Sequence, residues 1–233
     1  MMKRFAPEEL RAAGIAFGFA ARLVQVEPSE DWVRQCIEED MFDASPFGED
    51  DEAVVEGLQL MSAWCKSAKD DVVDHTKQIQ REWLRLFVGL GSPEASISES
   101  FYVEPNSSLF SKTTLSVRGA YREWGLENSR KLNEPDDSLG MMLAFCSHLL
   151  NLAADALEAG ESDKADKAIT ALESFMVEHL LPWVSAWRFL VKQHAASAYY
   201  RGIGEFVFGL ERACADRMGV AFNEEDGSFS YRG

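Results

Sequence analysis

The chain has 233 residues, of which 46% are hydrophobic, a composition that can form a folded core and that excludes a disordered chain. It carries 23 Lys and Arg residues against 39 Asp and Glu residues, which gives a net charge of −16 at pH 7. Nucleic-acid phosphates and anionic membrane surfaces repel such a protein, so we expect no nucleic-acid partner, whereas a basic peptide would be attracted.

The N-terminal segment predicts an amphipathic helix. Pro7 followed by Glu8 and Glu9 is typical of the first turn of a helix. Basic residues precede this stretch, but Arg11 and Arg22 flank or interrupt the apolar residues, which argues against a signal sequence. No apolar run in the chain approaches about 18 uninterrupted residues, so we expect no membrane insertion and a cytoplasmic location.

Apolar residues recur at three- and four-residue spacing along most of the chain, which indicates amphipathic helices. Alternating strand patterns of useful length are absent. We therefore predict an all-α fold, a helical bundle of about nine to eleven helices. The apolar positions that carry this prediction include Leu10, Phe17, Val24, Val54, Leu58, Met61, Ile79, Trp83, Leu143, Leu150, Leu172, Phe175, Phe206 and Leu210.

Between Glu27 and Glu56 the chain contains twelve acidic residues and one basic residue, Arg34. A charge run of this kind usually forms a solvated helix face with its loop. The alternative is a docking surface that attracts a cationic segment.

The stretch from Gly89 to Ser108, GLGSPEASISESFYVEPNSS, is the longest one without helical periodicity. We interpret it as an irregular linker near residues 89–108, and long irregular connections are often functional. The predicted organisation is a single domain over 1–233, with N-terminal helices in 7–90, C-terminal helices in 108–218 and a tail in 219–233.

The stretch KLNEPDDSLGMMLAFCSHLL places a proline and two aspartates directly before a long apolar run. Pro135, Asp136, Asp137 and Ser138 suit a helix start, where an Asp or Ser side chain caps free backbone N–H groups. With Glu134, however, three carboxylates lie within four residues, which is more than one cap needs. We predict that Asp136 or Asp137 caps the helix and that the remaining carboxylates face a binding groove.

The sequence contains no catalytic motif and no metal-binding spacing of Cys and His residues. Glu178 and His179 are adjacent and lack the spacing of di-iron helical bundles, and His148 falls on or near an apolar helix face. The four cysteines are typical of reduced thiols in apolar helix faces. We therefore expect no enzyme activity.

Five segments resemble segments of the TorD/DmsD/NarJ family of redox-enzyme maturation chaperones, and they occur along the chain in the same order as in the family. NEPDDSLGMMLAF resembles the family signature E-P-D-D-H-L-x-x-x-L-x-F, and the other segments resemble the family's L-F-x-G, P-x-E-S-V-Y, V-R-x-x-Y and H-L-x-x-W-x-x-x-F patterns. Together the similarity covers roughly residues 7 to 215. The four other segments are Arg81 to Gly91, Ile97 to Tyr102, Ser108 to Glu127 and Phe175 to Leu210. The match departs at Ser138, where the family has His, and the proline before the Glu-Ser pair is also missing.

The resemblance implies a cytoplasmic, all-helical chaperone without enzyme activity. Such a protein binds the twin-arginine signal peptide, or the apo form, of a molybdopterin oxidoreductase catalytic subunit and delays export until the cofactor is inserted. No cofactor of its own is expected, although weak nucleotide binding stays open. Some members exchange helices, so the chain would be a monomer or a helix-swapped dimer.

A twin-arginine leader is a basic segment followed by an apolar one, so its binder needs carboxylates and an apolar groove. The predicted signal-peptide-binding residues therefore combine acidic and aromatic side chains near the linker. They are Glu134, Pro135, Asp136, Asp137, Ser138, Phe101, Tyr102, Arg118, Tyr121 and Trp124.

Several of these residues also have a purely structural interpretation. Tyr121 and Trp124 lie at helical spacing, which is more typical of a core. Arg118 would either pair with a carboxylate such as Glu134 or contact the ligand. Phe101 and Tyr102 lie in the irregular stretch, where aromatic residues more often bind partners. Because Ser138 replaces the family histidine, the alternative function is a diverged all-helical interaction scaffold that no longer binds a leader peptide.

Overall fold

A computed structural model describes residues 5–89, 91–104, 111–128 and 134–232. These residues form ten α-helices, two π-helical turns and one two-stranded sheet. The all-α prediction is therefore confirmed, and the helix count lies within the predicted range. The elements are α1 (Pro7–Gln25), α2 (Glu30–Glu38), α3 (Glu52–Ala68), α4 (Val72–Trp83), η1 (Leu84–Val88), α5 (Glu99–Val103), α6 (Lys112–Glu123), α7 (Leu139–Glu158), α8 (Ser162–Phe175), η2 (Met176–Leu180), α9 (Val184–His194), α10 (Ala198–Arg217), β1 (Val220–Asn223) and β2 (Ser228–Tyr231).

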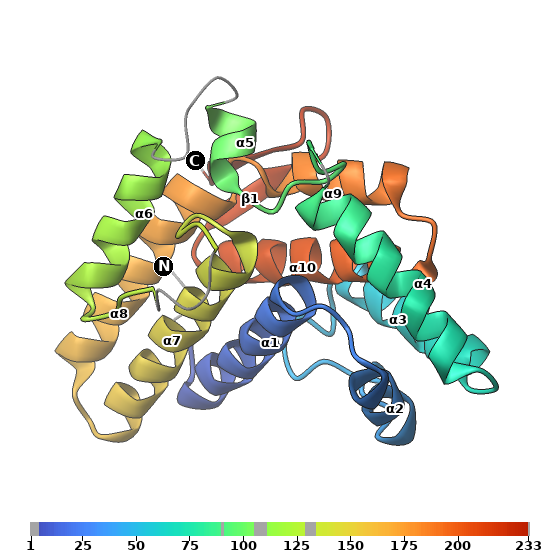
Figure 1. Ribbon diagram of the computed structural model, residues 1–233. Helices are drawn as coiled ribbons and strands as arrows, with labels where there is room; N and C mark the ends of the chain where they lie inside the picture. The colour runs from blue at the N-terminus through green and yellow to red at the C-terminus, as the bar shows by residue number, and fades with distance from the viewer. Residues whose placement is uncertain (1–4, 90, 105–110, 129–133, 233) are drawn as a thin grey trace.

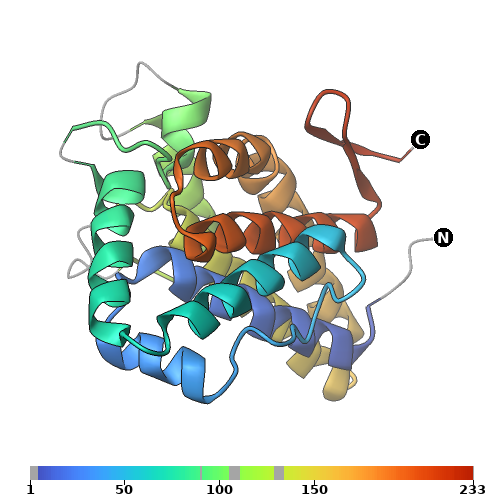
Figure 2. The ribbon, with the colours of Figure 1, turned by 90° about the vertical axis from the view of Figure 1, so that its right-hand side faces the viewer.

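Helices from the two halves of the chain pack against one another. α1 lies along α7 and α3 lies along α10, while α10 also contacts α1 and α9 (Figure 1, Figure 2). α10 runs through the middle of the bundle, and most of its residues are buried. The buried apolar residues of these helices belong to one hydrophobic cluster, whose burial is the main favourable contribution to folding.

Glycines bring the backbones of α3 and α10 into direct contact. A Cβ atom at Gly57 would lie 2.6 Å from the backbone N of Phe206 and 2.7 Å from the carbonyl O of Gly202. A Cβ atom at Gly209 would lie 2.5 Å from the backbone N of Val54. Side chains larger than hydrogen at these positions would separate the two helices.

Small and polar side chains join α1 to α7. The Ser147 hydroxyl donates a hydrogen bond to the Gly14 carbonyl at 2.6 Å, and Arg11 pairs with Asp155 at 2.6 Å. α7 is long and apolar enough to cross a membrane, but 61% of its most apolar window is buried inside the fold. Such burial is typical of a core helix, and α7 carries the largest share of the interface with α1.

Most helix boundaries follow the punctuation of the sequence. Ser29 caps α2 by accepting the Trp32 N–H at 3.2 Å, and the acidic loop before Glu52 separates α2 from α3. Pro182 interrupts the helical pattern as predicted, because η2 ends at Leu180 and α9 begins at Val184. Eleven of the twelve acidic residues between Glu27 and Glu56 are exposed, in agreement with a solvated face; the exception, Asp51, is half-buried.

The segment predicted to be irregular contains the short helix α5, from Glu99 to Val103. This helix is too short for its periodicity to be detected, and residues far along the chain hold its backbone in place. Residues 90 and 105–108 of the predicted linker lie outside the described residues.

Within the predicted tail, β1 and β2 form a β-hairpin. β1 and β2 pair antiparallel, with Val220 opposite Tyr231 and Phe222 opposite Phe229. Gly227 adopts a φ of +70° at the end of the turn, a conformation that glycine adopts without strain. The Phe222 and Phe229 rings lie 4.9 Å apart, and Phe222 packs edge-on against Phe208 of α10. The Asp-Gly pair in the turn between the two strands is the signal that sequence reasoning missed.

Candidate functional site

The Glu134–Ser138 segment connects α5, α6 and α7, and Asp137 is its most buried side chain. One carboxylate oxygen of Asp137 accepts the backbone N–H of Ser100 at 2.9 Å, and the other accepts the Thr114 hydroxyl at 3.1 Å. Its carbonyl accepts the backbone N–H of Glu99 at 3.0 Å. Asp137 is fully buried, so its carboxylate holds the first turn of α5 to α6 and is closed to solvent.

Asp136 anchors α6 through two side chains. The Arg118 guanidinium donates from Nε to its carboxylate at 2.7 Å, and the Tyr121 hydroxyl donates to its carbonyl at 2.9 Å. Asp136 is buried, whereas the Arg118 side chain is 36% exposed. Of the two predicted roles of Arg118, carboxylate pairing or ligand contact, the structure shows carboxylate pairing. The partner is Asp136 instead of Glu134.

The prediction that Asp136 or Asp137 caps α7 is wrong. α7 begins at Leu139 after Ser138, and no side chain caps its N-terminus. The two aspartates instead accept hydrogen bonds from a charged donor on α6, 18 residues upstream of Asp136, and from a backbone donor on α5, 37 residues upstream of Asp137. A local pattern cannot reveal donors at such separations.

The remaining members of the segment are Glu134, Pro135 and Ser138. Glu134 is half-buried and accepts a hydrogen bond from the Gln25 amide at 3.0 Å, and Pro135 is exposed. The Ser138 hydroxyl is buried and points toward Glu134, at 3.5 Å. Direct contact with a ligand in this conformation is thus restricted to Glu134 and Pro135, and a peptide-binding role for the segment stays a prediction.

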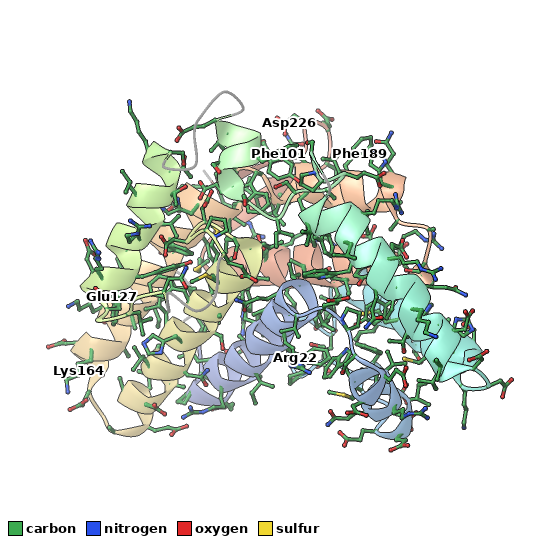
Figure 3. All side chains as sticks on the ribbon, in the orientation of Figure 1. Arg22, Phe101, Glu127, Lys164, Phe189 and Asp226 are labelled. Carbon is green, nitrogen blue, oxygen red and sulfur yellow. The ribbon has the colours of Figure 1, made fainter. Side chains whose placement is uncertain are left out.

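Phe101 and Tyr102 lie on α5, away from the other predicted aromatic residues. Phe101 is 40% exposed at the upper edge of the molecule in Figure 3. Tyr102 is half-buried: its ring stacks on Trp183 at a centroid distance of 4.9 Å, and its hydroxyl donates to the Ser96 carbonyl at 2.8 Å. The structure does not bring these two residues together with Trp124.

A groove of about 800 Å³ runs between α6 and α8. Its apolar lining includes Trp124, Phe145 and Phe175. Tyr121 lies directly behind this lining, with its ring 4.9 Å from Phe145 and 6.0 Å from Phe175. Tyr121 is therefore a core residue, and Trp124, half-buried, is the one predicted site residue that faces the groove.

The charged side chains around this groove are mostly acidic. Glu123 and Glu178 are exposed and line it together with Asp166, against one cation, Lys167. The Lys167 ammonium lies 5.4 Å from the centroid of the Trp124 ring, within the range of a cation–π interaction. An apolar groove with acidic residues at its edge suits a segment that combines positive charge with apolar side chains.

Sequence reasoning missed a buried pair at the wall of the groove. His179 Nδ1 lies 3.1 Å from a carboxylate oxygen of Glu99, and its Nε2 lies 3.3 Å from the Ser116 hydroxyl. Burial raises the pKa of Glu99, an effect that the hydrogen bond from His179 opposes. The pair joins α5 to the π-helical turn η2. Because these elements lie about 80 positions apart in the chain, no local sequence pattern predicts the contact.

The hydrogen bonds of Asp136, Asp137 and Glu99 therefore fix the positions of α5, α6 and η2 around one groove. Within the described ranges, no three His, Cys, Asp or Glu side chains converge as a metal-binding group. The four cysteines are free and buried, as predicted for apolar helix faces. The arrangement offers a binding surface made of an aromatic floor and a negatively charged edge.

Residues 48–188 match the family model described as nitrate reductase delta subunit. This range is more than half of the chain and includes both the Glu134–Ser138 segment and the whole groove.

Curated relatives match part of the chain. The Tat proofreading chaperone DmsD of Salmonella typhimurium is 26% identical over 129 residues, which are 55% of this chain and 56% of that protein. The chaperone protein TorD of Vibrio cholerae is 28% identical over 156 residues, 67% of this chain and 64% of that protein. The chain thus spans little more than half the length of the first of these relatives.

Proposed function

Because the chain belongs to the nitrate reductase delta subunit family, we propose that it is a redox-enzyme maturation chaperone and not an enzyme. It binds the twin-arginine leader, or the apo form, of a molybdopterin oxidoreductase catalytic subunit and delays export until the cofactor is inserted. Its place of action is the cytoplasm, where an unexported precursor is found. The names of the relatives, DmsD and TorD chaperones, support the chaperone class.

The observation that carries the proposal is the groove between α6 and α8. Its aromatic lining provides apolar surface for the leader's hydrophobic part, and Glu123 and Glu178 provide negative charge for its arginines. The net charge of −16 adds long-range attraction for a cationic segment. All groove residues lie within the stretch that matches the family.

Titration calorimetry with the leader of a molybdopterin oxidoreductase encoded beside this chain tests the proposal. We expect binding with a roughly micromolar dissociation constant. Replacing both arginines by lysines should weaken it, because lysine lacks the planar, multidentate guanidinium. Raising the salt concentration should weaken it further, since exposed charges are screened. If the lysine form binds with the same affinity as the arginine form, and high salt does not weaken binding, then the groove does not recognise arginine and the proposal is contradicted.

A diverged scaffold is the second candidate, and Ser138 favours it. The family histidine at this position is replaced by a buried hydroxyl that points at Glu134, so the contact that a histidine would make is absent. A chain that binds neither the leader nor the apoprotein would support this candidate over the first.

A further inference from the structure

We propose that the exposed face of Trp124 is an arginine subsite and that Lys167 is an intramolecular cation which an incoming guanidinium displaces. The inference rests on the proposed function and assigns the residues of its groove that recognise an arginine. The occupant is a peptide segment in which an arginine is followed by an apolar residue.

The Trp124 ring already holds a cation. Lys167 on α8 reaches across the groove and places its ammonium 5.4 Å from the ring centroid. Lys167 is exposed and forms no ion pair with the described carboxylates, so moving it away breaks only this one contact. A guanidinium stacks on an indole face with its flat surface and is more weakly hydrated than an ammonium, which favours the ligand's arginine over the lysine in this place.

Two exposed carboxylates line the same groove as this ring. Glu123 adjoins Trp124 at the end of α6, and Glu178 lies on η2 on another wall of the same groove. Both side chains are exposed, and neither accepts a hydrogen bond nor forms an ion pair within the described part of the chain. By contrast, Asp136 and Asp137 are buried and occupied by Arg118, Ser100 and Thr114. Glu123 and Glu178 are thus available to meet an arginine, whereas the two aspartates of the motif are not.

The floor of the groove favours an apolar ligand residue next to the arginine. Phe145 and Phe175 line it, and their rings pack edge-on at a centroid distance of 4.8 Å. A ligand residue placed next to the Trp124 face therefore contacts apolar surface, which favours the binding of an aromatic or aliphatic side chain.

The test uses a synthetic pentapeptide, acetyl-Ala-Arg-Arg-Phe-Leu-amide, titrated into the full chain by calorimetry. Lys167→Met removes the internal competitor and should tighten peptide binding about threefold. Trp124→Leu should weaken it about fivefold, and Glu178→Gln about threefold. Each estimate converts the free energy of one exposed cation–π or charge-assisted contact into a change in affinity.

Lys164→Met is the matched control for Lys167→Met. Lys164 lies one turn earlier on α8, pairs with Glu161 at 2.8 Å and does not line the groove (Figure 3). Its removal changes the net charge by the same amount, so it should leave the affinity within about twofold. An equal gain from both variants would show that only overall charge matters and would overturn the subsite.

The two proposals fail in different ways. If the pentapeptide does not bind, or if Lys167→Met fails to tighten it and Trp124→Leu fails to weaken it, the arginine subsite is overturned. Binding of the complete leader or of the apoprotein by the same preparation would then leave the chaperone function standing. Loss of pentapeptide, leader and apoprotein binding together would overturn both.

Discussion

At the scale of single residues, we expect Asp137 to contribute to the stability of the fold more than to ligand binding. Asp137→Ala leaves the Ser100 N–H and the Thr114 hydroxyl without their acceptor in a buried place. We expect a loss of unfolding free energy on the order of 3 kcal/mol, measured by urea denaturation. Asp137→Asn retains one acceptor oxygen and should lose less.

The control for Asp137 is Glu123→Ala, an exposed carboxylate on the neighbouring helix. Its stability should stay within about 0.5 kcal/mol of the unaltered chain. If Asp137→Ala unfolds at the same urea concentration as this control, yet weakens leader binding, then Asp137 contacts the ligand and the internal role is refuted.

Glu211 makes stability depend on pH. It is fully buried on α10, neither carboxylate oxygen has a partner among the described residues, and burial raises its pKa well above the usual range. The folded chain therefore keeps a proton that the unfolded chain releases above the ordinary pKa of glutamate. Stability falls as pH rises from that ordinary value toward the raised one.

Glu211→Gln should remove this dependence, because the amide has the same shape and does not ionise. We expect the variant to have the higher melting temperature, by about 2–4 °C for each kcal/mol gained, with a difference that grows between pH 5 and pH 8. Thermal unfolding at both pH values measures it. A constant difference across this range would mean that Glu211 does not stay protonated in the fold.

At the scale of helices, the crossing of α3 and α10 depends on glycine. Gly57→Ala would place a Cβ atom 2.6 Å from the Phe206 backbone, which does not yield as a side chain can. We expect a loss of about 1–3 kcal/mol in unfolding free energy, measured by chemical denaturation.

Gly119→Ala supplies the opposite case in the same experiment. Gly119 lies within α6, and nothing lies within 4 Å of the position of a new Cβ atom. Alanine should therefore stabilise the helix by about 0.5–1 kcal/mol. Two substitutions with the same sign would contradict the close crossing of α3 and α10.

Sequence periodicity predicts the long helices because each buries a continuous apolar face. It fails where the structure depends on distant partners or on short segments. α5 has five residues and is held by Asp137, and the hairpin has two strands of four residues each, below the length at which alternation is evident. The Asp-Gly turn was its available signal.

The candidate site was predictable to a similar extent. Sequence reasoning predicted the Glu134–Ser138 segment and Trp124. Trp124 lines the groove, and the segment contacts Tyr121 behind this lining. The directions of Asp136 and Asp137 depend on donors in α5 and α6, and Lys167 and His179 reach the groove from helices more than 40 residues beyond Trp124. Such contacts result from tertiary packing and not from local pattern.

At the scale of the whole molecule, two neighbouring regions have two roles. The buried segment around Asp136 and Asp137 fixes the helices, and the groove between α6 and α8 is the site that we propose for the client's basic, apolar segment. The acidic stretch from Glu27 to Glu56 does not line this groove, and we expect it to add long-range attraction for that segment.

The most direct test is photo-crosslinking of a twin-arginine leader that carries a benzoylphenylalanine immediately after its arginine pair. Mass spectrometry of the crosslinked chain locates the attachment. We predict crosslinks within residues 116–124 and 166–179, reduced by an excess of unlabelled leader. Competed crosslinks that fall instead in the acidic stretch, or in the hairpin over 220–231, would contradict a leader site between α6 and α8.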